Sequence, residues 1–315
     1  MKPSADSSPG STSAAGADTA ARRLKLMLEG HLDGAWAIPD LPRWFRPDNL
    51  DVSLAQVMDC VSHKGWIQMD PDMFWRNISD RKDEIEQIRQ QFYQTMTQHQ
   101  FHVASDSVCD TSDEACQFNL DEIKRLHPDL VAIVAKENPL RDKDASSFIL
   151  RIARHAPSSV LVIRRPLKDP ARMRVLFATD GSEVSNHAAA RLPQLLRTDA
   201  MDVTVMTILE NVAYMENPVI APYVNAEAVE EALRQNGSMI VEMTRDVLQA
   251  EGINVVDTKV ACGAPSAELL RQADALDPDL VVMGSHNRRG LPGWLLGSVS
   301  YRMVQSSHQS VLVVR

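Results

Sequence analysis

Residues 277–290 read DPDLVVMGSHNRRG, and residues 127–140 read HPDLVAIVAKENPL. Each stretch places Pro-Asp-Leu directly before a short apolar run, which is the pattern of a strand buried on both faces. The likeness continues downstream, where SSVLVIRR at residues 158–165 matches QSVLVVR at residues 309–315. Because internal repeats determine the architecture of a chain, we interpret this one as a tandem duplication.

One spacing relates the two copies. Arg164 lies 151 positions before Arg315, and Asp51 in DVSLAQV lies 151 positions before Asp202 in DVTVMTI. A chain of 315 residues also has enough apolar material for two cores of ordinary size. We therefore predict a disordered tail at residues 1–21, a first domain at 22–165, a linker at 166–173 and a second domain at 174–315.

The tail and the linker are assigned from composition. Residues 1–21 contain no Leu, Ile, Val or Phe, so they cannot bury enough apolar surface to offset the entropy of ordering. The linker contains Pro166 and Pro170, which interrupt any regular element. We expect both segments to lie outside the packed cores.

The second domain alternates between strand and helix patterns, and the first domain shows the same order more weakly. A long helix is predicted where apolar residues recur at helical spacing, at Val229, Leu233, Ile240, Met243 and Val247, and its counterpart runs through Ile85, Ile88, Phe92 and Met96. Such alternation favours an α/β fold with a parallel sheet covered on both faces. In the second domain we expect strands at 174–180, 202–209, 253–261, 279–284 and 310–315, with helices after residue 182, along 229–247, at 266–276 and at 297–307.

The charge balance excludes some classes of partner. The formal net charge is −9, which repels polyanions, so a nucleic acid or an anionic membrane surface is not expected as a partner. No apolar run approaches the length of a membrane span, and no secretion signal is present, so a soluble cytoplasmic protein is expected. The four cysteines fit reduced thiols, although a metal site at Cys109 and Cys116 is an alternative.

A candidate anion site follows the fourth strand of the second domain. Gly284 lies directly after the strand and lets the backbone approach a ligand closely, and Asn287 tolerates a left-handed turn. Gly297, Ser298 and Ser300 then open the next helix, where unpaired amides and the helix dipole favour an anion. The spacing therefore predicts a phosphate site.

This stretch, G-S-H-N followed by nine residues and G-S, resembles the ATP-binding signature of the universal stress protein family, Gly-x2-Gly-x9-Gly-Ser/Thr. VLFATDGS and SVLVVR also resemble the first and last strands of that family. The resemblance covers residues 174–315 and, faintly, 22–165, and Asn287 stands where the family has its second glycine. It implies two tandem Rossmann-like domains of the adenine nucleotide alpha hydrolase-like type, each a five-stranded parallel sheet with helices on both faces.

The resemblance also implies an ATP site, with Mg²⁺ bridging the phosphates, although no carboxylate cage for the ion is present. Asp180 would accept a ribose hydroxyl, and backbone atoms of Ile208 would meet the adenine edge. As alternatives, Asp180 could cap the following helix, and His286 is better read as a local hydrogen-bonding residue than as a proton donor. The implied nucleotide-binding residues are Ala178, Thr179, Asp180, Ile208, Met283, Gly284, Ser285, His286, Asn287, Gly297, Ser298, Val299 and Ser300.

The first domain lacks these features. Val134 stands where the second domain has Gly284, and Glu137, Asp142 and Asp144 would repel a triphosphate. No Gly-Ser pair opens the following helix. The sequence therefore predicts one nucleotide site per chain, in the C-terminal half.

We expect a nucleotide-dependent stress-response or regulatory protein rather than an enzyme, because neither an S-G-G-x-D-S loop nor an H-x-G-H pair is present. Two alternatives stay open: a structural or interaction module whose two sites have both decayed, and a weak ATPase. The resemblance implies an internal pseudo-dimer in which SVLVIR pairs with SVLVVR, covering two strand edges. Further homodimerisation is undecided, and the sequence names no protein partner.

Overall fold

The computed structural model describes residues 22–29, 32–48, 50–58, 71–110, 113–135, 143–169, 171–210, 226–285 and 296–315. The predicted tail at residues 1–21 lies outside these ranges. Within the described ranges, no helix combines the length and the apolar composition that a membrane span requires.

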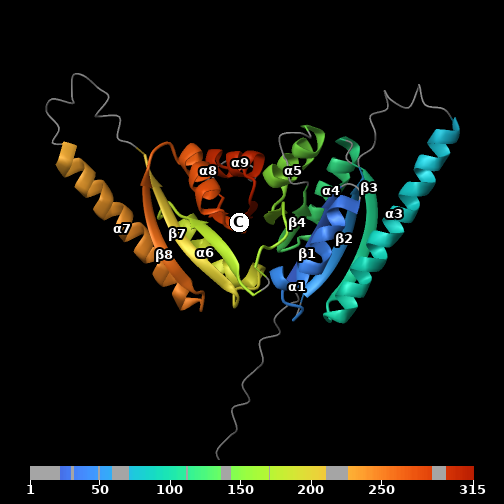
Figure 1. Cartoon of the computed structure of the whole chain (residues 1–315), viewed down its shortest axis with the longest axis horizontal. Helices are drawn as coiled ribbons and strands as arrows, with labels where there is room; N and C mark the ends of the chain where they lie inside the picture. Colours follow the sequence, from blue (N-terminus) through green and yellow to red (C-terminus); the bar gives the residue numbers. More distant parts are fainter. Residues whose placement is uncertain are drawn as a thin grey trace, which may run out of the picture.

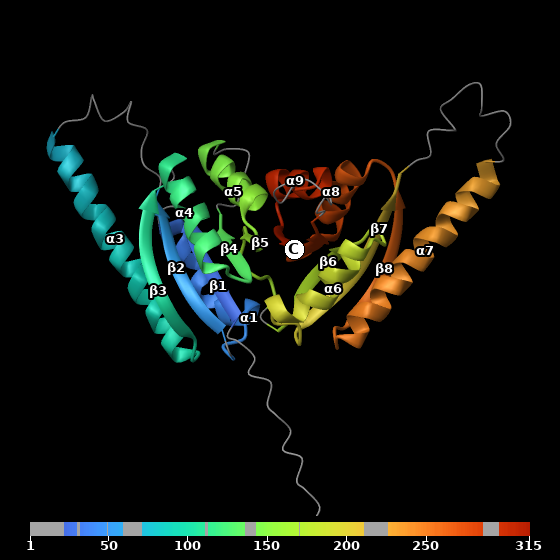
Figure 2. The same cartoon turned by 180° about the vertical axis from the view of Figure 1, so that it is seen from behind.

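Each half contributes five strands to the described structure. The two halves lie side by side (Figures 1 and 2). The elements of the first half are β1 Arg22–Glu29, η1 Leu32–Asp40, α1 Leu41–Trp44, β2 Leu50–Met58, α3 Pro71–Gln98, β3 His102–Asp110, α4 Asp113–Leu126, β4 Leu130–Val134, α5 Lys143–His155 and β5 Ser159–Ile163. Those of the second half are β6 Met173–Ala178, α6 Glu183–Leu195, β7 Met201–Leu209, α7 Ala226–Ala250, β8 Val255–Cys262, α8 Pro265–Leu276, β9 Leu280–Gly284, α9 Ser298–Ser306 and β10 Ser310–Val314.

The strands of both halves form one continuous sheet in the order β3-β2-β1-β4-β5-β10-β9-β6-β7-β8. Pairing is parallel within each half and antiparallel where β5 meets β10, with Leu161 opposite Leu312. The expected α/β fold with two five-stranded parallel halves is confirmed, and so is the pairing of SVLVIR with SVLVVR.

The repeated Pro-Asp-Leu has a structural role. The Asp279 carboxylate accepts the N–H of Arg174 at 2.8 Å, and the Asp279 N–H donates to the Arg174 carbonyl at 2.8 Å. Asp129 makes the same two bonds with Arg23, at 2.9 and 2.8 Å. Each aspartate therefore fixes the start of β4 or β9 against the start of β1 or β6, which explains why both copies of the sequence contain the motif.

Two apolar cores lie on opposite faces of the sheet, and each extends through both halves. One core gathers side chains from η1, α1, α3, α6 and α7, and the other gathers them from α4, α5, α8 and α9. The long helices α3 and α7 lie along the outer sides of the molecule (Figure 1). Because both cores cross the β5–β10 junction, the halves share their hydrophobic stabilisation.

The long helix α7 confirms the predicted element but corrects its buried face. Met243 is 60 % exposed, whereas Val241, Thr244 and Leu248 are buried. The burial of Thr244 was not predicted, because a pattern of apolar residues does not include a residue with a hydroxyl group. In the first half, Ile88, Phe92 and Met96 of α3 are buried as expected.

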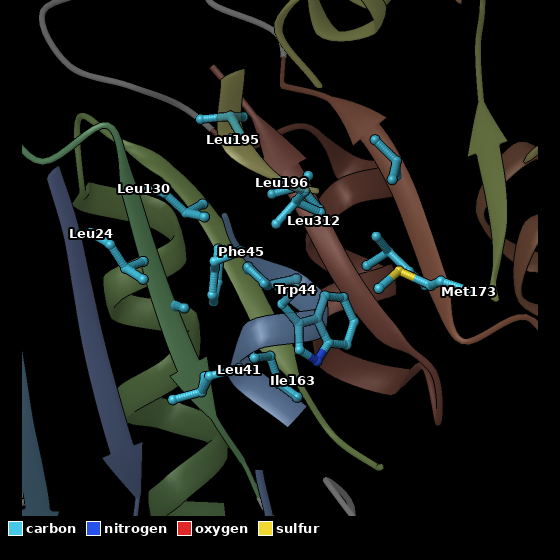
Figure 3. Close-up of a cluster of buried hydrophobic side chains, with 14 of the residues drawn as sticks. Leu24, Leu41, Trp44, Phe45, Leu130, Ile163, Met173, Leu195, Leu196 and Leu312 are labelled. Carbon is cyan, nitrogen blue, oxygen red and sulfur yellow. The ribbon is translucent and has the colours of Figure 1, made fainter. Parts of the chain in front are cut away.

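At the junction between the halves, the two copies of the repeat differ in structure. The second half has the regular helix α6 at residues 183–195, whereas residues 32–44 of the first half form η1 and the short α1. Pro39 contributes to the difference, since proline removes an amide donor that a longer helix requires, whereas Pro42 corresponds to Pro193, which α6 accommodates. The irregular segment contributes Trp44, fully buried, to a cluster that also contains Met173, Leu195, Leu196 and other side chains from both halves (Figure 3).

Polar contacts reinforce this junction. The Arg197 N–H donates to the Trp44 carbonyl at 2.8 Å. The Asp199 carboxylate accepts the Arg197 Nε at 2.9 Å and pairs with Arg46 of the first half at 3.3 Å. These contacts tie the loop after α6 to the segment that follows α1. Leu167 is buried although it lies in the predicted linker, and β6 begins at Met173.

We predict that Asp199 makes the junction sensitive to acid. The hydrogen bond from Arg197, helped by the one from Arg46, lowers the pKa of Asp199 from 3.8 to about 2. A carboxyl group whose pKa is lower in the folded chain stabilises it above the unfolded pKa, and this stabilisation is lost as the pH falls from about 4 towards 2. The wild type should therefore lose stability over this window more steeply than Asp199→Asn. Urea unfolding at pH 7, 4 and 3 measures this, and parallel stability curves would contradict it.

Candidate functional site

A cavity of about 370 Å³ opens at the carboxyl ends of the parallel strands of the second half. Three strands, β6, β7 and β9, end at it, and three helices, α6, α8 and α9, begin at it. Ligands of parallel α/β sheets bind at this edge because the helix N-termini present unpaired amides there. The lining residues are Ala178, Thr179, Asp180, Ser182, Val184, Ser185, Met206, Ile208, Pro265, Leu269, Met283, Gly284, Gly297, Ser298, Val299 and Ser300.

Most of the residues predicted from the sequence lie around this cavity: Ala178, Thr179, Asp180, Ile208, Met283, Gly284, Gly297, Ser298, Val299 and Ser300. Ser285 does not line it, because its side chain is buried and its N–H donates to the Val314 carbonyl at 2.9 Å. His286 and Asn287 lie outside the described residues. The structure thus brings one predicted group of residues together around a single cavity.

One wall of the cavity is apolar. Met206 and Ile208 alternate along β7, and Pro265 and Leu269 lie one turn apart at the start of α8. Met283 comes from β9, which pairs with the opposite edge of β6 from β7. A flat aromatic ring suits such a wall, since apolar lining with a few fixed polar groups is the usual composition of small-ligand sites.

Another part of the cavity is formed by the N-terminus of α9. Gly297 is the N-cap, with extended backbone and no side chain to cap the helix, and the Tyr301 N–H makes the first helical bond to its carbonyl at 2.8 Å. The amides of Ser298, Val299 and Ser300 therefore have no acceptor within the helix. The helix dipole adds a partial positive charge at the same place, so this end of the cavity favours an anion.

Gly284 lies against the first turn of α6. A Cβ atom at this position would lie 2.9 Å from the Val184 carbonyl oxygen and 3.0 Å from its Cγ1 atom. The glycine therefore allows the first turn of α6 to pack against the end of β9, and it also lines the cavity. Its carbonyl accepts the Ser300 hydroxyl at 3.3 Å, which links the first turn of α9 to the same point.

Asp180 lies in the turn between β6 and α6. Its Oδ1 accepts the Ser182 N–H at 3.0 Å, and Gly181 beside it has φ +75°, a conformation that favours glycine. The alternative that Asp180 caps α6 is wrong, because Ser182 is the N-cap and its side chain accepts the Ser185 N–H. The carboxylate is thus oriented by the turn and exposed at the mouth of the cavity.

Glu268, on α8 close to this edge, is held by other groups. Hydrogen bonds from Arg271 and then Gln272 lower its pKa to about 2. It is therefore ionised at neutral pH and engaged with its own helix, which makes it unsuited to donate a proton. Among the described lining residues, Asp180 is the only one with an ionisable side chain.

The first half differs at the equivalent edge. Val134 pairs with Ile163 as Gly284 pairs with Val314, so the predicted equivalence of Val134 and Gly284 is confirmed. Val134 is fully buried. On the face covered by α4, Lys25 of β1 is 1 % exposed and forms an ion pair with Glu122 of α4 at 2.7 Å, where β6 of the second half has Leu176. Glu137 and Asp142 lie outside the described residues, as does the side chain of Asp144.

Sequence reasoning missed several lining residues, and some of them had a signal. Met206 lies two residues before Ile208 on the same face of a strand, so alternation alone could have found it. Pro265 opens a helix directly after a strand, which is a recognisable N-terminal position. Val184 had no such signal, because its approach to Gly284 depends on how α6 crosses β9.

Comparison with known proteins bears on the same region. Residues 171–315 match the sequence profile of the universal stress protein family. A universal stress protein of Methanocaldococcus jannaschii is 27 % identical over 142 residues, which covers 45 % of this chain and 81 % of that protein. One from Mycobacterium tuberculosis is 29 % identical over 167 residues, covering 52 % of this chain and 54 % of that protein.

Similarity of fold extends through both halves. The crystal structure of a universal stress protein from Archaeoglobus fulgidus aligns with 92 % of this chain and 96 % of its own, with a TM-score of 0.56 and 14 % sequence identity. At this identity the comparison concerns the fold alone. The tandem arrangement of two α/β halves is therefore shared with that protein.

Proposed function

Residues 171–315 form a domain of the universal stress protein family, and from this we propose that the C-terminal half binds one adenine nucleotide, with ATP as its ligand. The observation that carries the proposal is the cavity itself. It combines an apolar wall at Ile208 and Leu269 with the uncapped N-terminus of α9 at Ser298. A purine ring suits the first and a phosphate chain suits the second.

In the proposed complex, each end of the nucleotide has its own partners. The base would lie against the apolar wall, and Asp180 would accept a hydroxyl of the sugar. The amides and hydroxyls of Ser298 and Ser300 would hold the phosphates, with Mg²⁺ carried by the phosphate oxygens. When bound, the phosphates supply negative charge at the α9 dipole, and the chain's own residues bind and orient them.

We further propose that the nucleotide acts as a regulatory ligand rather than as a substrate. The described lining consists of apolar groups, hydroxyls, amides and one carboxylate that already accepts the Ser182 N–H. Such groups bind phosphates, but none is an activated base or nucleophile. Occupancy would then alter the affinity of the chain for other molecules in a stress response.

Isothermal titration of the full chain with Mg-ATP tests the proposal. We expect one ATP per chain, since the first half has a buried valine at the position of Gly284. Two ATP molecules per chain would contradict the single site. No heat of binding, together with no retained nucleotide, would instead favour a structural or interaction module with two decayed sites. Turnover well above background would favour a weak ATPase.

Replacing Ser298 by aspartate tests the phosphate end directly. A carboxylate at the first residue of α9 suits the helix dipole, so the fold should keep its stability. The same charge repels phosphates, so ATP affinity should fall by about tenfold or more, whereas adenosine affinity should change little. Ser298→Asn is the uncharged control. Equal losses for ATP and adenosine would contradict a phosphate contact at Ser298.

A further inference from the structure

Three hydroxyl groups form a buried chain behind the cavity. Thr179 follows β6, Ser185 lies in the first turn of α6, and Thr244 lies on α7. The Thr179 Oγ1 lies 3.1 Å from the Ser185 Oγ and 3.0 Å from the Thr244 Oγ1. Their exposed fractions are 6 %, 4 % and 0 %, so solvent does not replace these contacts.

The direction of hydrogen bonding among these three hydroxyls follows from the one proton that each hydroxyl carries. Ser185 donates to the Ser182 carbonyl at 2.9 Å, and Thr179 donates to Ser185. Thr244 must then donate to Thr179, whose oxygen also accepts the Gly181 N–H at 3.2 Å. The turn at residues 179–182, which carries Asp180, is therefore anchored from behind by α7.

The first half provides an internal comparison. Helices α3 and α7 end in the same way: the Phe101 N–H bonds to the Met96 carbonyl as the Ile253 N–H bonds to the Leu248 carbonyl. Phe92 therefore occupies the position of Thr244, four residues before that carbonyl. The duplication likewise places Leu28 at the position of Thr179, because β1 pairs with β4 in the same register in which β6 pairs with β9.

Both first-half residues are apolar and buried in one core, Leu28 at 2 % and Phe92 at 0 % exposure. Packing a helix against a strand end in this fold therefore does not require hydroxyls. Within the described residues, the hydroxyl chain occurs in the half that has the cavity. Its role is thus more specific than the packing that both halves share.

We propose that Thr244, which does not line the cavity, is a positioning residue that sets Asp180 for the sugar of the bound nucleotide; this rests on the function proposed above. Without the Thr244 hydroxyl, Thr179 loses a hydrogen-bond donor, and the turn at residues 179–182 loses its anchor on α7. A carboxylate held less firmly makes a weaker bond to a sugar hydroxyl. The phosphate contacts at α9 do not depend on this anchor.

The test compares binding of ATP with binding of 2′,3′-dideoxy-ATP, which lacks the sugar hydroxyls. The wild type should prefer ATP by about tenfold or more, as expected for a hydrogen bond to a charged group. Thr244→Val keeps the volume and removes the hydroxyl, so ATP affinity should fall about tenfold while dideoxy-ATP affinity stays nearly constant. The preference for ATP should then largely disappear.

Thr207→Val is the matched control. Thr207 is 1 % exposed on β7, and its hydroxyl is buried without a hydrogen-bond partner among the described residues. Replacing Thr207 removes a buried hydroxyl from the same domain and leaves the hydroxyl chain of Thr179, Ser185 and Thr244 intact. Thr207→Val should therefore bind both nucleotides like the wild type. If Thr244→Val also does so, the positioning role is refuted.

A second pair of variants guards against a folding defect. Thr244→Ala and Thr244→Ser both remove the methyl group, but only serine keeps the hydroxyl. We expect serine to retain the preference for ATP and alanine to lose it. Equal behaviour of the two would overturn the proposal. A wild type that binds neither nucleotide overturns the proposed function itself, and a wild type that binds both equally overturns only the sugar contact and its positioning.

Discussion

Replacing Arg315 by methionine is expected to destabilise the folded chain by about 3 kcal/mol or more. The Arg315 side chain is 7 % exposed although it is charged, and burial lowers its pKa only to about 10, so it stays protonated at neutral pH. Its guanidinium crosses the β5–β10 junction and donates to carbonyls of Ala153, Ala156 and Ser158 at the end of α5. Methionine fills the volume of the stem but leaves these carbonyls without donors.

The duplication repeats this arrangement in the opposite direction. Arg164 is 1 % exposed and donates to the Val304 carbonyl near the end of α9. The Arg164 N–H bonds to the Ser310 hydroxyl at 3.2 Å, and the Arg315 N–H bonds to the Ser159 hydroxyl at 3.1 Å. Each half thus caps the C-terminal end of a helix in the other, where a positive charge suits the helix dipole.

Urea unfolding followed by tryptophan fluorescence measures the loss, since Trp44 is buried at the same junction. Arg271→Met is a suitable control, because Arg271 is 65 % exposed and pairs with Glu268 on its own helix. A pair whose arginine is solvent-exposed contributes about 1 kcal/mol or less. If Arg315→Met is no less stable than Arg271→Met, the interlocking arginines do not hold the halves together.

Much of the fold could be predicted from sequence because buried parallel strands are short, continuous apolar runs. LVVMG at 280–284 and SVLVV at 310–314 are recognisable without any tertiary information. The repeat then predicted two halves with the same succession of strands and helices, because equality between copies can be read directly from a sequence. The pairing of the two last strands was implied by the family resemblance. The order of the strands in the sheet was not predicted.

What could not be predicted depends on contacts between distant elements. Arg164 and Arg315 mark the repeat, but only the structure shows that they are buried and reach the opposite half. Thr244 carries no apolar signal, yet it belongs to the buried face of α7. Gly284 was identified from the sequence, but its close contact with Val184 was not, since the packing of α6 on β9 has no local signature.

Gly284 therefore supports the second large prediction: Gly284→Val should destabilise the chain by about 3 kcal/mol and abolish measurable ATP binding. The new Cβ alone would lie 2.9 Å from the Val184 carbonyl oxygen, which is backbone and cannot rotate away. Overpacking of this kind typically costs about 1–3 kcal/mol, and the added methyl groups of valine place the effect at the upper end. The first turn of α6 has to move, and it carries Ser182 and Val184, which line the cavity.

Gly297→Ala separates this steric effect from a general need for glycine in the cavity. A Cβ atom at Gly297 would have the Ser300 hydroxyl as its nearest neighbour, at 4.0 Å, so stability should change by less than about 1 kcal/mol. Gly284→Ala should fall between the two variants, because it adds the clashing atom without the branches. Thermal unfolding ranks the three, and equal stability of Gly284→Val and Gly297→Ala would refute the contact with α6. Binding that survives in a stable Gly284→Val protein would show that α6 does not shape the ATP site.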